Sequence, residues 1–186
     1  MQFLIDLWLP ILVASVAVFF VSSLVHMVFG YHQSDYQGLP GEDGIFEAFR
    51  KAGAGPGDYF LPYCTSMKDL ANPEVVKKFE QGPVGFLTLR PPGPPAMGAQ
   101  LMQWFLYTIL VSVCIAYVAD FALPEGATFM QVLRITGTIA TLVYGLGHAP
   151  NSIWKGVSWT TSFKFLFDGL LYGLATGAVF GWLWPA

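Results

Sequence analysis

Charged residues are scarce in this sequence. They make up 11% of the 186 residues, whereas soluble domains contain about 25%. The net charge is −3 and no run of Lys or Arg occurs, so the chain lacks the basic surface that nucleic acid needs. Hydrophobic residues make up 54% of the chain. The composition therefore predicts a protein whose main solvent and partner is the lipid bilayer.

Cysteines and catalytic motifs are also few. Of the two cysteines, Cys64 lies in a polar stretch and Cys114 lies within an apolar one, so we expect two free thiols and no disulfide. The sequence contains no C-x-x-C or H-E-x-x-H motif, nucleophile elbow or phosphate-binding glycine loop. We therefore do not expect an enzyme, and the sequence requires no cofactor.

Long apolar segments dominate what is present. A span needs about 20 apolar residues, and residues 1–29 and 97–186 supply enough for four. The four predicted transmembrane helices are the segment within 1–29 and those at 97–123, 129–147 and 163–184. The predicted fold is an all-α membrane protein with four transmembrane helices. A small folded extramembrane loop domain, of α(+β) type, connects the first two.

That loop domain, residues 30–96, holds most of the charges and prolines. Residues 42–51 have the pattern of an amphipathic helix. Asn72-Pro73-Glu74 combines an N-cap, a proline at the first helical position and an acid near the positive end of the helix dipole, so it predicts a second helix that ends at Gly82. Residues 59–63 and 85–90 are candidate strands.

Small residues recur every fourth position in the last two predicted helices. Residues at this spacing lie on one face of a helix, and in apolar helices such a face allows close backbone approach. We therefore expect the third and fourth helices to pack against each other through six glycines. They are Gly137, Gly145, Gly169, Gly173, Gly177 and Gly181.

The basic residues predict an orientation. Four spans place both termini on one side of the membrane and the long loop on the other. Eight of the nine Lys and Arg residues fall on the loop side, with Arg134 as the exception. The positive-inside rule then places loop 30–96 in the cytoplasm and both termini in the periplasm.

Ionisable groups within spans are usually paired or functional, because burying them in lipid costs at least about 2.5 kcal/mol. Asp168 is interpreted either as a structural anchor, held by loop side chains or by Lys164, or as an ion or proton site. For Arg134 we expect a structural ion pair with Asp120.

Three histidines should meet near the loop-side surface. His26 ends the first span, His32 follows it and His148 ends the third, with Asp35 and Asp168 at a similar depth. Imidazole and carboxylate together can bind zinc, iron or copper, and two histidines on different helices can hold a haem. Structural histidines and a pH-sensitive contact are the alternatives.

Several short stretches carry a resemblance. They are Val25-His26-Met27 with His32, Ser34-Asp35-Tyr36, Leu39-Pro40, Gly82-Pro83-Val84-Gly85, Asn151-Ser152-Ile153-Trp154 and Phe167-Asp168-Gly169-Leu170. On these stretches the chain resembles an uncharacterised family of four-span bacterial membrane proteins. The resemblance implies a bacterial inner-membrane setting and no particular activity.

Two functions remain open from the sequence. The first is a non-catalytic accessory subunit of a larger membrane complex, such as one in electron transport, with other membrane-protein subunits as partners. The alternative is a small transporter or a metal- or haem-binding membrane protein that uses His26, His32, His148 and Asp168.

Overall fold

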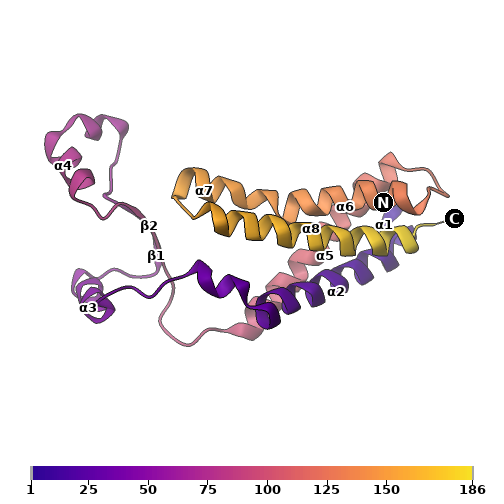
Figure 1. Cartoon of the computed structure of the whole chain (residues 1–186), viewed down its shortest axis with the longest axis horizontal. Coiled ribbons are helices and arrows are strands. Elements are labelled where there is room, and N and C mark those ends of the chain that lie inside the picture. Colours follow the sequence, from indigo (N-terminus) through magenta and orange to yellow (C-terminus); the bar gives the residue numbers. More distant parts are fainter. Residues whose placement is uncertain (1, 186) are drawn as a thin grey trace. The chain divides into compact units, whose positions relative to one another are not determined.

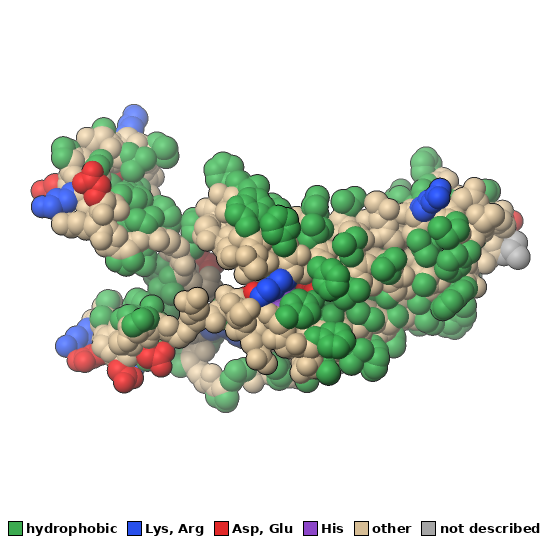
Figure 2. Space-filling view, in the orientation of Figure 1, with side chains coloured by type: hydrophobic (Ala, Val, Ile, Leu, Met, Phe, Trp, Pro, Cys, Tyr) green, Lys and Arg blue, Asp and Glu red, His purple; other side chains and the backbone are tan. Residues whose placement is uncertain are grey.

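Four long helices dominate the structure, a computed structural model that describes residues 2–185. Among these residues, four helical segments are long and apolar enough to cross a membrane: Trp8–Phe29, Met97–Ala122, Phe129–Lys155 and Trp159–Trp182. Hydrophobic side chains cover most of the visible face of this helical part, whereas charged ones gather over two helices of the loop (Figure 2). These features fit a multi-pass membrane protein.

The chain divides into two compact units. The helical unit contains the residues up to Tyr36 and those from Ala96 onward. Its elements are α1 (Phe3–Asp6), α2 (Trp8–Ser23), the π-helix η1 (Leu24–Phe29), the 3₁₀ helix η2 (Tyr31–Asp35), α5 (Met97–Ala122), α6 (Phe129–Tyr144), η4 (Leu146–His148), α7 (Ala149–Lys155) and α8 (Trp159–Trp182). Within this unit α1 and the end of α8 lie at one end and α7 lies at the other (Figure 1).

Helices α6 and α8 form the closest contact of the helical unit, and glycines line it. A Cβ atom added at Gly169 would lie 2.5 Å from the Cα of Gly145, and one added at Gly173 would lie 2.6 Å from the carbonyl oxygen of Gly137. Both contacts are with backbone atoms, which cannot turn aside as a flexible side chain can. Gly145 and Gly169, and likewise Gly137 and Gly173, are therefore close enough to leave no room for a Cβ between their backbones.

Helices α2 and α5 are joined by hydrogen bonds between small polar side chains. The Ser15 hydroxyl lies 3.1 Å from the Ser112 hydroxyl and 3.3 Å from the Thr108 carbonyl oxygen. Near the other end, the Trp104 indole N–H donates to the Ser22 hydroxyl at 2.8 Å. Such bonds hold helices together where lipid offers the polar groups no other partner.

The structure differs from the sequence-based boundaries around the last two helices. The predicted spans 129–147 and 163–184 leave a connection between them, but Ala149–Lys155 within that connection is helical. Helix α8 begins at Trp159 rather than at 163, because the Ser158 hydroxyl accepts a hydrogen bond from the Thr160 N–H and caps the helix. The last predicted segment therefore has one additional turn that carries polar residues.

The structure does not bring Arg134 and Asp120 together. Neither takes part in the ion pairs found among residues 2–185. Both side chains are exposed, because the buried face of α6 is formed by other positions, including Val132, Thr136 and Ala140. The sequence predicts how deep a charged residue lies along a span. It does not predict whether that residue faces another helix or points away from the bundle.

The loop unit, Gln37–Pro95, is small and open. It contains α3 (Glu42–Ala52), β1 (Gly57–Leu61), the 3₁₀ helix η3 (Met67–Ala71), α4 (Pro73–Gln81) and β2 (Gly85–Leu89). The strands pair antiparallel, with Gly57 opposite Leu89 and Leu61 opposite Gly85. The Asn72 side chain caps α4, as its sequence predicts. Neither α3 nor α4 has a fully buried residue.

Candidate metal centre

Asp168 is the buried centre of a polar cluster at the α7 end of the helical unit. Its side chain is 1% exposed. The carboxylate accepts hydrogen bonds from the Tyr31 hydroxyl and from Nε2 of His32, the latter at 2.8 Å. The partners of Asp168 therefore come from η2, and Lys164 is not one of them.

The approach of η2 to α8 depends on Gly30. This residue ends η1 and has φ of +61°, a left-handed conformation that strains any residue with a Cβ. The reversal turns the chain after the first span into η2, where His32 and Asp35 are three residues apart. Residues at that spacing share one side of a short helix, and here that side faces Asp168.

His32 lies between two carboxylates. Its Nδ1 is 2.6 Å from Asp35 Oδ2, and its Nε2 is 2.8 Å from Asp168 Oδ2. An ionised carboxylate only accepts hydrogen bonds, so the ring donates to both acids only as the doubly protonated imidazolium. In that form His32 and Lys164 would together carry two positive charges opposite the two carboxylates.

Lys164 fastens η2 to α8. Its ammonium group donates to the Tyr31 carbonyl oxygen at 2.8 Å, to the Ser34 hydroxyl at 2.8 Å and to Asp35 Oδ1 at 2.6 Å. These three bonds use all three donors of the group. Lys164 is therefore fully satisfied and has no free donor for a further ligand.

The surroundings shift the pKa values of two η2 residues. Burial alone would raise the pKa of Asp35, but hydrogen bonds from Lys164 and His32 outweigh burial and lower it below the usual value. Burial, followed by the hydrogen bond to Asp168, raises the pKa of the Tyr31 hydroxyl. Asp35 is therefore held as a carboxylate, and Tyr31 keeps its proton to donate to Asp168.

His26, from the π-helix η1, completes a possible ligand set. Its Nδ1 lies 3.1 Å from the Ser22 carbonyl oxygen. A proton on Nδ1 makes that contact a hydrogen bond and leaves a lone pair on Nε2, the arrangement seen in metal-binding histidines. One ligand atom from each of His26, His32 and Asp168 lies within 4.8 Å of the others.

The ring geometry shows what binding would require. The imidazoles of His26 and His32 are stacked, with centroids 4.6 Å apart and planes 3° from parallel. A metal lies near the plane of each imidazole that binds it, so one ion cannot serve two parallel stacked rings. His26 is the ring that can turn, because it is exposed and held by one hydrogen bond, whereas His32 is held at both nitrogens.

His148 does not join this cluster, although the sequence places it at the same level. Its ring stacks on Phe165, with centroids 3.6 Å apart and planes 6° from parallel. Phe165 also contacts His32, with a centroid separation of 4.8 Å. Among the described residues, three of the four predicted ligands come together, and His148 lies against the neighbouring aromatic ring.

Sequence reasoning assigned no role to Tyr31, and it placed Asp35 at the level of the histidines without its link to His32 or Lys164. Their signal is local: the segment Tyr31-His32-Gln33-Ser34-Asp35 places an acid three residues after a histidine, which is a short-helix pairing distance. The link from Lys164 to Asp35 carries no such signal, because it joins residues 129 positions apart.

Comparison with known proteins supplies no relative for this chain. No protein-family model, curated protein or solved structure matches it. The resemblance to a four-span bacterial family therefore stays a prediction.

Proposed function

We propose that the protein binds a divalent transition-metal ion through His26, His32 and Asp168. The supporting observation is that one ligand atom of each residue lies within 4.8 Å of the others. The remaining nitrogen of His32 is held by Asp35, and the exposed ring of His26 can turn out of its stack toward the ion. Two imidazoles and one carboxylate suit zinc or ferrous iron. The ion takes the place of the proton between His32 and Asp168.

Asp35 would orient His32 by accepting a hydrogen bond from Nδ1, the ring nitrogen that does not bind the ion. A carboxylate that accepts from the distal N–H of a ligating histidine fixes the ring and makes it more basic. The 2.6 Å contact between Asp35 Oδ2 and His32 Nδ1 has this geometry. Three protein ligands leave at least one coordination position open, which suits an ion that is exchanged or moved. A small metal transporter is therefore the use of this site that we favour.

Metal content tests the site directly. We expect the purified protein, reconstituted with zinc or ferrous iron, to retain about one ion, and we expect His26→Ala and His32→Ala each to lose it. Asp35→Asn should weaken affinity by about 10- to 100-fold. The measurements are elemental analysis after desalting and competition with a metal-binding dye.

His148→Ala is the matched control, because this histidine stacks on Phe165 outside the cluster, and it should retain the ion. If the His26 and His32 variants keep as much metal as the His148 variant, the proposed site is wrong.

We further propose that the protein lies in the bacterial inner membrane with the loop unit in the cytoplasm. The support is the distribution of Lys and Arg. In a chain without Cys64 and Cys114, we expect an impermeant maleimide to label Glu125→Cys in intact spheroplasts. Tyr63→Cys, in the loop unit, should react only after the membrane is opened.

Glu125 and Tyr63 are both exposed, so the pair differs only in the side of the membrane. Labelling of Tyr63→Cys in intact spheroplasts would show that the protein has the opposite orientation. The accessory-subunit function, with partner subunits of an electron-transport complex, stays a prediction. Purification of the protein from its native membrane in mild detergent tests it, because partner subunits would copurify.

A further inference from the structure

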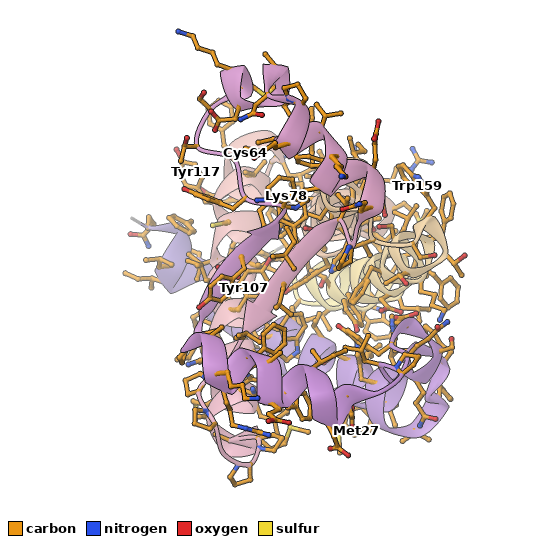
Figure 3. The ribbon with its side chains drawn as sticks, turned by 90° about the vertical axis from the view of Figure 1, so that its left-hand side faces the viewer. Met27, Cys64, Lys78, Tyr107, Tyr117 and Trp159 are labelled. Atoms are coloured by element: carbon orange, nitrogen blue, oxygen red, sulfur yellow. The ribbon has the colours of Figure 1, made fainter. Side chains whose placement is uncertain are left out.

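A cavity of about 660 Å³ lies among the four candidate spans, beside the group formed by His26, His32 and Asp168. Residues from all four spans line it, among them His26, Trp104, Tyr107, Tyr144, His148 and Tyr172. Met27 and Tyr107 are labelled in Figure 3. The volume is in the range of sites for small organic ligands, about 300–1,000 Å³.

Three polar atoms of this lining have no partner in the structure. They are the hydroxyls of Tyr144 and Tyr172 and Nδ1 of His148. Tyr144 is 8% exposed and Tyr172 is 3% exposed, so neither hydroxyl is satisfied by bulk solvent. A buried polar group without a hydrogen bond is unfavourable, and a ligand that accepts these bonds would remove that penalty.

Aromatic packing fixes the position of these groups. The Tyr144 ring meets Tyr172 edge-on at 5.6 Å and Tyr107 edge-on at 6.0 Å, and it lies 6.0 Å from Trp104. His148 is held by its stack on Phe165. The hydroxyls and the imidazole therefore form a preorganised set of polar groups in an otherwise aromatic and aliphatic wall.

The chemistry of the lining limits the ligand. No Asp, Glu, Lys or Arg belongs to the described lining. The lining therefore suits an uncharged ligand, and the propionates of a haem would find no cation there. The position among the spans requires a ligand that is soluble in lipid. The aromatic wall suits a flat ring, and the phenol hydroxyls suit ring oxygens that accept hydrogen bonds.

We propose that this cavity binds the head group of a quinone, with its carbonyl oxygens accepting hydrogen bonds from Tyr144 and Tyr172. His148 provides a third polar contact through Nδ1. The assignment does not depend on the metal site, although His26 belongs to both. It concerns binding alone.

Binding is tested with the full chain in lipid nanodiscs and a ubiquinone that carries a single isoprene unit. We expect saturable binding, measured by calorimetry. Tyr144→Phe and Tyr172→Phe, which remove only the hydroxyls, should each weaken it roughly five- to tenfold. An isoprenoid alcohol of the same chain length should bind much more weakly.

Tyr117→Phe is the matched control, because Tyr117 is an exposed tyrosine of α5 outside the cavity. It should bind the quinone as the unmodified protein does. Equal binding of the alcohol and the quinone would show a lipid-filled cavity and overturn the proposal. Unchanged affinity in both cavity variants, or no saturable binding, would do the same. Metal content measured on the same samples separates this result from that for the metal site.

Discussion

Replacing Asp168 with alanine is expected to lower the free energy of unfolding by about 3–5 kcal/mol, the usual effect of removing one partner from a buried ion pair. The substitution leaves the Tyr31 hydroxyl and His32 Nε2 without their acceptor. It also leaves Asp35 as the only carboxylate within hydrogen-bond distance of His32 among the described residues. The measurement is unfolding by dodecyl sulfate in mixed micelles, with a chelator present so that metal does not contribute.

Asp120→Ala is the control for this experiment. Asp120 is exposed and takes no part in the ion pairs of the described residues, so its loss should change stability by less than about 0.5 kcal/mol. A double variant with His32→Ala should lose less than the sum of the single losses, because the two residues share one interaction. Equal stability of the Asp168 and Asp120 variants would show that Asp168 does not stabilise the fold.

Adding one methyl group at Gly169 is expected to destabilise the protein by about 3 kcal/mol, at the upper end of overpacking effects. The new Cβ would lie 2.5 Å from the Cα and 2.6 Å from the nitrogen of Gly145. Relief requires α6 and α8 to move apart, and that also separates Gly173 from Gly137. Unfolding in mixed micelles measures the loss.

Gly98→Ala provides the comparison. Gly98 is also helical, in α5, but a Cβ there would meet nothing within 4 Å. The change should be neutral or slightly stabilising, because alanine favours a helix over glycine by about 1 kcal/mol. If both alanine variants have the same stability, the close backbone contact between α6 and α8 is not required for the stability of the protein.

The four long helices could be predicted from the sequence for a simple reason. Hydrophobic length identifies a span, and a spacing of four places Gly169 and Gly173 on one helix face whatever lies opposite. The capping residue Asn72 is equally local. These features depend on neighbours within a few turns, so the order of residues carries them.

The partners within the cluster were not readable in the same way. Sequence placed His26, His32, His148 and Asp168 at one depth, but depth does not fix the direction of a side chain around its helix. The left-handed turn at Gly30 directs His32 toward Asp168, whereas the ring of Phe165 takes His148 as its stacking partner. Both outcomes depend on contacts between distant segments.

His26 gives the two proposed sites a common element, because its ring stacks on His32 and also lines the cavity. A single ring cannot serve both in unrelated orientations. If turning His26 toward an ion changes the cavity, occupancy of each site must alter the affinity of the other by the same factor, since binding free energies are reciprocal. The π-helical turn that carries this ring would then act as a joint through which a metal ion and a lipid-soluble molecule compete or cooperate.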